Sequence, residues 1–165
     1  LNDALIAEVK HIVASGKMDA QYAITRKSVA FGVTFSYGVL YPDHVLRMFP
    51  RESVTWVNKV HEHPECPLPA KRLPGYIEHH TYKDWHQWEE KLCLYTTIWA
   101  EDAYRRGKRT TLPGIFTHSL GGFFKMFFVR RGFLDGYLGM YMCCNHFFYT
   151  MLKYLKLHEL QRRGA

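Results

Sequence analysis

The hydrophobic period of the sequence changes near residue 83, and this change limits the folds that the chain can adopt. Before that point, short runs rich in β-branched and aromatic residues are separated by glycine and proline, which is typical of strands. After it, apolar residues recur at intervals of three and four, which is typical of helices. The sequence therefore predicts an α/β protein with a strand-bearing part, residues 1–82, and a helical part, residues 83–165.

The first part is expected to begin with a short surface helix. Asn2 is a good N-cap, and apolar residues at helical spacing follow it until Ser15 and Gly16 end the pattern. Four β-prone runs come next and predict strands. They cover residues 21–30, 33–40, 44–49 and 53–60.

A proline-rich stretch follows these runs. Pro64, Pro67, Pro69 and Pro74 lie too close together for a regular element, so the sequence predicts a loop that crosses the surface. A last short strand is expected at residues 76–80, directly before the helical part.

The helical part is expected to begin with one long helix. Asp84 is a good N-cap with Gln87 three residues later, and Gly107 closes the helix. The large apolar residues of this helix share one face, which we expect to pack against other parts of the protein. They are Trp85, Trp88, Leu92, Tyr95 and Trp99.

The last third of the chain is aromatic and interrupted by glycines. Residues 133–155 are apolar nearly all round, yet they include Asp135, Asn145 and His146. A spanning helix needs about 20 mostly apolar residues, so we expect helices that lie in a membrane interface or pack together. The net charge is +7, and the basic residues around this region favour contact with an anionic membrane surface. They are Lys125, Arg130, Arg131, Lys153, Lys156, Arg162 and Arg163.

Several classes of protein are disfavoured by what the sequence lacks. The four cysteines show no Cys-x-x-Cys spacing, which disfavours a zinc finger or a disulfide scaffold. A reducing, cytoplasmic setting fits this cysteine pattern best. No signal-peptide pattern is visible, and the common phosphate-loop, dinucleotide, serine-hydrolase and zinc-protease motifs are missing. The aromatic residues fall on helical stripes and not on alternating strand positions, so we expect no nucleic-acid partner.

Four motifs occur in order along the chain. They are Tyr41-Pro42-Asp43 with Arg47 and Phe49, then Val60-His61-Glu62, then His79-His80-Thr81-Tyr82, and finally Gly132-Phe133-Leu134-Asp135-Gly136. In this order and spacing they resemble the family 2 glycosyltransferases that add a sugar to lipopolysaccharide core or a related envelope glycan. The resemblance implies part of a GT-A domain, with a mixed sheet and flanking helices, followed by a helical, aromatic C-terminal appendage.

The resemblance also implies an activity, namely the inverting transfer of a hexose, with glucose as the first choice, from a UDP-sugar to such an acceptor. Glu62 is the candidate general base, because it follows a predicted strand and precedes the proline stretch, which places a carboxylate at a rim. His61 could orient Glu62 or tune its pKa. Asp43 is the alternative base.

Other roles follow from the same resemblance. His79 aligns with a ligand of the Mg²⁺ or Mn²⁺ ion that such enzymes use, and Tyr41 and Arg47 belong to the strand that borders the acceptor groove, with Tyr82 as a further substrate contact. Arg47 is expected either to bind a phosphate or carboxylate or to pair with Asp43, four residues away.

The Gly132–Gly136 motif is expected to meet the membrane. Arg130 and Arg131, directly before it, would contact anionic headgroups, while Phe133 and Leu134 would enter the acyl boundary. Glycines around Asp135 would allow a tight entry into a helix.

The family places a strand ending in Asp-x-Asp just before the position of Leu1, so we expect the chain to lack the nucleotide-binding half and to be inactive alone. The expected partners are a nucleotide-sugar donor, a glycolipid or oligosaccharide acceptor, and the inner face of a bacterial cytoplasmic membrane. A non-catalytic, membrane-associated adaptor is the alternative, in which the basic aromatic C-terminus contacts lipid and the tryptophan helix binds a partner protein.

Overall fold

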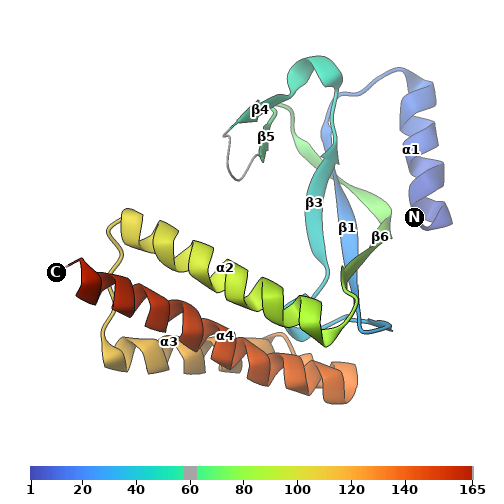
Figure 1. Cartoon of the computed structure of the whole chain (residues 1–165). Coiled ribbons are helices and arrows are strands. Elements are labelled where there is room, and N and C mark those ends of the chain that lie inside the picture. Colours follow the sequence, from blue (N-terminus) through green and yellow to red (C-terminus); the bar gives the residue numbers. More distant parts are fainter. Residues whose placement is uncertain (58–62, 165) are drawn as a thin grey trace. The chain divides into compact units, whose positions relative to one another are not determined.

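The computed structural model describes residues 1–57 and 63–164 (Figure 1). The protein is α/β, with a mixed sheet and helices, and about 57% of it is helical. Its contacts form two compact units. The first, Leu1–Ser28 with Pro42–His79, is called the sheet unit, and the second, Val29–Tyr41 with His80–Ala165, is called the helical unit.

The sheet unit begins with helix α1 (Asp3–Ser15), as the sequence predicts. The Asn2 side chain accepts a hydrogen bond from the Leu5 N–H at 3.3 Å, and Gly16 ends the helix with a φ of 65°. The buried face of α1 packs on the strands in a core that contains Leu5, Ile12, Ala20, Tyr22 and Leu73.

Strand β1 (Gln21–Ala30) is central to the sheet and pairs antiparallel with β3 (Asp43–Met48). Strand β6 (Ala70–Tyr82) also pairs with β1. The Gln21 N–H donates to the Pro69 carbonyl and the Phe31 N–H to the Tyr82 carbonyl, an order that makes this pair parallel. The short strands β4 (Thr55–Val57) and β5 (His63–Glu65) form a separate antiparallel pair.

Two strand predictions are corrected by the structure. The proline stretch is a loop only in part, because Pro67 and Pro69 lie between β5 and β6, but Pro64 lies in β5 and Pro74 lies in β6. Proline cannot donate to a ladder but is accepted at a sheet edge, and β6 is an edge strand of the sheet as described. In the run 33–40, only β2 (Val33–Thr34) is a strand, and Gly38–Leu40 form a 3-10 turn.

The described residues of the helical unit form three α-helices: α2 (Trp85–Arg105), α3 (Leu112–Phe124) and α4 (Gly136–Arg163). A π-helical turn (Lys125–Val129) and a 3-10 turn (Gly132–Asp135) connect α3 to α4. Within the described parts of the chain, none of the helices has the length and apolar character required to cross a bilayer.

Helix α2 begins as predicted. Asp84 accepts a hydrogen bond from the Gln87 N–H at 2.8 Å, and the Gln87 side chain in turn accepts one from the Lys83 N–H at 3.1 Å. Part of its apolar stripe is used for packing, as expected, whereas Trp85 and Tyr95 are 44% and 48% exposed. Trp88 is buried, and the ring of Trp99 lies 4.8 Å from that of Tyr154 on α4.

A tight turn between β1 and β2 supports the start of α2. Phe31 and Gly32 both have positive φ, 53° and 76°, and connect the paired residues Ala30 and Val33. This conformation is unfavourable for a bulky residue such as phenylalanine. The Phe31 ring stacks on Trp85 with centroids 3.9 Å apart, so aromatic contact compensates for the backbone strain.

His146 of α4 is a half-buried imidazole in the helical unit. It lies against Gly122 of α3, where an added Cβ would come within 3.3 Å of the ring. Burial, together with the positive charges of Lys153, Lys125 and Arg130, lowers its pKa to about 4. Folding therefore favours neutral His146, and this contribution to stability is complete above about pH 6.5 and is lost as the pH falls toward 4.

We expect His146→Gln to reduce the fall in the free energy of unfolding between about pH 6.5 and pH 4. Urea unfolding at several pH values in this range measures the effect. His11→Gln is the control for replacing a histidine, because His11 is exposed on α1. An unchanged profile in the His146 variant would contradict the assignment.

Candidate functional site

A basic pocket with aromatic walls lies in the helical unit. It has a volume of about 270 Å³ and is lined by Tyr37, Tyr41, Val129, Arg130 and Arg131. We call it the arginine pocket. It brings Tyr41, which the sequence predicts at the acceptor groove, together with two residues predicted to contact the membrane.

Asp135 positions the two chain segments that form the arginine pocket. Its carboxylate accepts hydrogen bonds from the Ser36 N–H, at 3.1 and 3.2 Å to the two oxygens, and from the Tyr37 N–H at 2.8 Å. The Gly38 N–H donates to the Arg130 carbonyl at 2.9 Å. The Asp of the Gly132–Gly136 motif thus binds backbone on the opposite side of the pocket.

Gly38 and Gly132, which follow and precede the residues in the Asp135 hydrogen bonds, are in close contact. A Cβ on Gly38 would lie 2.8 Å from the Cα of Gly132. A Cβ on Gly132 would overlap the sulfur of Cys143, and one on Gly139 would overlap the Gly132 carbonyl oxygen. Burial raises the pKa of the Cys143 thiol to about 11, so this sulfur is a neutral packing group.

Gly139→Ala is expected to lower the free energy of unfolding by about 1–3 kcal/mol, because the added methyl group has no space. Gly121→Ala on α3 is the matched control, since nothing lies within 4 Å of a Cβ there. Alanine is favoured over glycine in a helix by about 1 kcal/mol, so the control should gain stability. Urea unfolding compares the two variants, and equal changes would refute the packing argument.

The arginine pocket is suited to an anion. The guanidinium of Arg130 lies over the Tyr41 ring, 5.4 Å from its centroid, and both arginines are exposed. Arginine presents a planar fork of donors that matches phosphate oxygens. The pocket can therefore hold a phosphate between charged and aromatic groups.

Arg131 has a strained backbone in this pocket. Its φ is 51° and its ψ is 39°, a left-handed conformation that non-glycine residues seldom adopt. Strained residues of this kind concentrate at ligand-binding sites, where surrounding structure holds them in place. Here the conformation directs the chain from the π-helical turn into the Gly132–Asp135 turn.

Asp43 forms a bidentate ion pair with Arg26. Its oxygens accept from Arg26 Nε at 2.9 Å and Nη2 at 2.7 Å, and the two residues are direct partners across β1 and β3. Arg47 lies four residues further along an extended strand, so its Cα is about 13 Å from that of Asp43. This is too far for the Asp43–Arg47 ion pair that the spacing in the sequence suggested. Each carboxylate oxygen of Asp43 accepts one hydrogen bond from Arg26, so Asp43 joins β1 to β3.

Arg47 itself occupies a β-bulge. Tyr22 pairs with Met48 and Ala23 pairs with Leu46, so Arg47 is the extra residue of β3, and it is exposed. Bulges redirect side chains and are common beside functional sites. This position is compatible with the predicted contact between Arg47 and an anionic acceptor.

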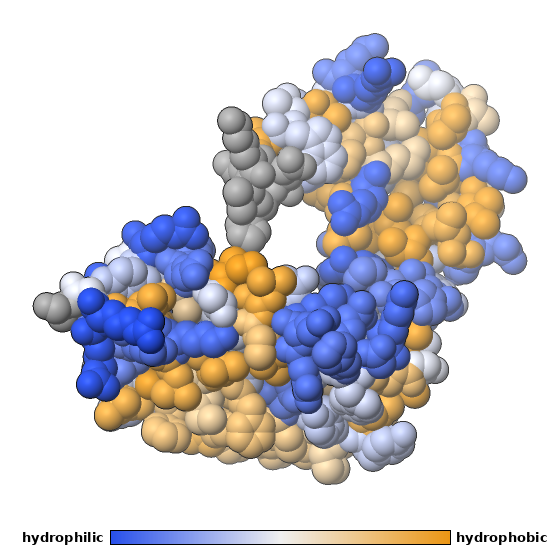
Figure 2. All heavy atoms as spheres, viewed as in Figure 1, coloured by the Kyte–Doolittle hydropathy of each residue, from blue (hydrophilic) through white to orange (hydrophobic). Residues whose placement is uncertain are grey.

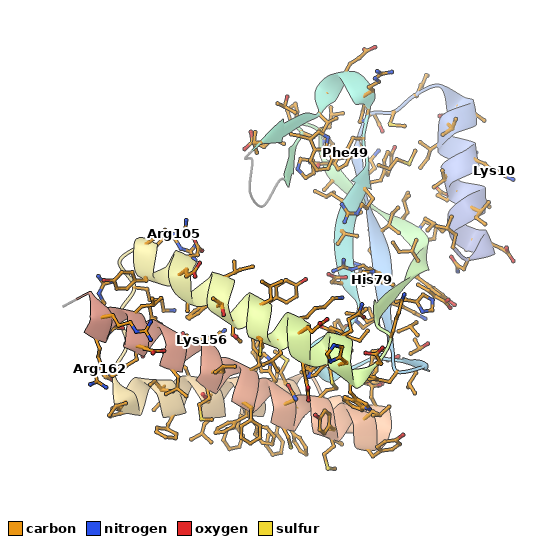
Figure 3. The ribbon with its side chains drawn as sticks, viewed as in Figure 1. Lys10, Phe49, His79, Arg105, Lys156 and Arg162 are labelled. Atoms are coloured by element: carbon orange, nitrogen blue, oxygen red, sulfur yellow. The ribbon has the colours of Figure 1, made fainter. Side chains whose placement is uncertain are left out.

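Tyr82 and His79 both lie on β6, but in different surroundings. The Tyr82 ring meets the edge of Trp88 with centroids 4.5 Å apart, and burial raises the pKa of its hydroxyl to about 12. Tyr82 is thus a neutral packing residue of the helical unit. His79, which is labelled in Figure 3, belongs to the sheet unit, and its side chain is partly buried.

A divalent cation would need more ligands than His79. Mg²⁺ and Mn²⁺ prefer several oxygen ligands, whereas His79 supplies one nitrogen. Over residues 1–57 and 63–164, no group of three or more His, Cys, Asp or Glu is placed to hold a metal ion. The described residues do not by themselves fit such an ion.

The predicted base Glu62 and its neighbour His61 lie outside the described residues. Near them in sequence, β4 and β5 border a cavity of about 610 Å³ in the sheet unit. Its polar lining comprises Gln21, Ser53, Thr55 and Glu65. Amide, hydroxyl and carboxylate groups of this kind suit the hydroxyls of a sugar.

Sequence reasoning missed two features of the helical unit. One is Tyr37, which lines the arginine pocket although it lies outside the four motifs. The other is a row of exposed apolar residues along α3 and the turn after it. A repeat of four in the sequence is the signal that would have found this row: Leu112, Phe116, Leu120, Phe124 and Phe128.

No model of a known protein family matches the chain, and no solved structure matches it. The arginine pocket is a candidate anion site, and the cavity of the sheet unit is a candidate site for a polyhydroxylated ligand.

We expect Arg131→Gly to raise the free energy of unfolding by up to about 1 kcal/mol, because glycine adopts the left-handed backbone without strain. Arg130→Gly removes the same charge at a residue with an ordinary φ of −89° and should lower it by about 1 kcal/mol. Urea unfolding measures both variants. A loss of stability in both would show that Arg131 is not strained.

Proposed function

We propose that this chain works in an inverting family 2 glycosyltransferase with a GT-A catalytic domain. The enzyme transfers a hexose, with glucose as the first candidate, from a UDP-sugar to lipopolysaccharide core or a related envelope glycan. It acts as a peripheral protein on the inner face of the bacterial cytoplasmic membrane.

One observation supports this proposal most directly. Tyr41 of the predicted acceptor strand and the arginines before the predicted membrane motif are far apart in sequence, yet they line one pocket. An enzyme that modifies a lipid-linked glycan needs its acceptor contacts beside its membrane contacts. Val129 is 76% exposed at the rim of this pocket, so an apolar surface adjoins the anion site.

The proposed chemistry assigns separate tasks to the residues. Glu62 removes the proton of the acceptor hydroxyl, whose oxygen displaces UDP from the donor sugar, and the arginine pocket binds a phosphate of the acceptor. The polar cavity of the sheet unit holds sugar hydroxyls. The requirement for Mg²⁺ or Mn²⁺ comes from the resemblance alone and stays a prediction.

The test uses the protein made from the complete coding sequence that contains this chain. We expect transfer of labelled glucose from UDP-glucose into glycolipid, with a loss of about a hundredfold or more in Glu62→Gln because the base is removed. Glu52→Gln is the control, since Glu52 is an exposed carboxylate outside the motifs, and it should retain full activity. EDTA should stop transfer, and added Mn²⁺ or Mg²⁺ should restore it.

Undiminished transfer by Glu62→Gln would refute the assigned base, and the absence of transfer from any nucleotide sugar would refute the enzyme. The adaptor is then favoured, because the helical unit exposes many large apolar side chains. That alternative predicts liposome binding without turnover, unaffected by Glu62→Gln and His79→Ala.

A further inference from the structure

The row of apolar residues on α3 and on the turn after it forms a continuous exposed ridge, which we call the α3 ridge. Residues four apart lie on one ridge of a helix, and the five members of this row are each between 47% and 57% exposed. Figure 2 shows apolar surface along the side of the helical unit that carries α3. Monomeric soluble proteins seldom expose so many large apolar side chains together, so this ridge indicates an interaction surface.

A groove beside the ridge is lined by apolar side chains from both α3 and α4. It has a volume of about 290 Å³ and is formed by Leu120, Phe123, Cys144, Phe147 and Phe148. Its lining offers thiol and hydrocarbon groups and no charged or amide group. This composition fits an acyl chain better than a polar peptide segment.

The charges around the ridge identify the partner. Between residues 103 and 158 the chain contains nine Lys and Arg residues and one acidic residue, Asp135. The Asp135 carboxylate already accepts hydrogen bonds from the backbone. In the chain, Lys108 and Arg109 precede α3 and Lys125 follows it, whereas Arg105 and Arg106 belong to the end of α2 (Figure 3), where Arg106 pairs with Asp102.

We propose that the α3 ridge and its groove insert into the acyl boundary of an anionic phospholipid bilayer. The surrounding cations contact the headgroup phosphates, and the helices lie in the plane of the interface. Two copies of this face would bring like charges together, which disfavours self-association. The inference rests on the membrane location in the proposed function and not on sugar transfer.

The test measures flotation of the full chain with liposomes. Strong binding is expected to vesicles of phosphatidylglycerol and phosphatidylcholine, and weak binding to phosphatidylcholine alone. Leu120→Glu should reduce binding by about tenfold or more, because it places a charge in the acyl region. Leu94→Glu is the matched control, since Leu94 is a 55% exposed leucine on α2 and Leu120 is 47% exposed.

A fluorescent label reports which face inserts. Cys144 lies in the groove, and Cys93 is exposed on α2. In single-cysteine variants, a polarity-sensitive dye on Cys144 should shift its emission to the blue with anionic vesicles, whereas a dye on Cys93 should not. This measurement remains informative if Leu120→Glu fails to fold, which circular dichroism would detect.

Equal binding by Leu120→Glu and Leu94→Glu, or equal dye shifts at the two cysteines, would overturn the proposal. A stable dimer in lipid-free light scattering that Leu120→Glu dissociates would also overturn it, because the ridge would then be a protein interface. Lipid binding without sugar transfer would retain this inference and refute only the enzyme. Sugar transfer without lipid binding would refute this inference and support the enzyme.

Discussion

The carboxylate of Asp135 holds together the two chain segments on which the candidate site depends. Hydrogen bonds from the Ser36 and Tyr37 N–H groups to a charged acceptor are stronger than those between neutral groups. The contact between Gly38 and Gly132 lets the two backbones approach closely enough for these bonds to form. Without these hydrogen bonds and this contact, the two segments that carry the arginines and tyrosines of the pocket would not be held in fixed positions relative to each other.

Local signals in the sequence predicted much of the fold. The caps at Asn2 and Asp84 depend on residues three positions away, so the starts of α1 and α2 could be read directly. Pro64 and Pro74 were misread as loop residues because proline is excluded from a strand only where its missing N–H would be needed. Whether β6 lies at an edge is decided by its pairing with β1, which is not visible in a local pattern.

The candidate site was predicted in part and for similar reasons. Motif spacing named Tyr41, Arg130 and Arg131, but it gave no sign that they line one pocket. The partner of Asp43 was uncertain because the four-residue spacing of Arg47 suits a helix, whereas in paired strands the cross-strand residue Arg26 is closer. The α3 ridge was visible as a repeat of four, but only the structure shows that this face is uncovered.

The helical unit is discontinuous in sequence, because residues 42–79 of the sheet unit separate its two segments. The Ser36 and Asp135 partners are 99 positions apart, and closing so long a loop costs chain entropy before any contact repays it. If the sheet unit folds first, residues 42–79 are already compact, and the loop that Ser36 and Asp135 must close is shorter. During synthesis on the ribosome, the arginine pocket cannot close until residue 135 has emerged, so the anion site is among the last parts of the chain to form.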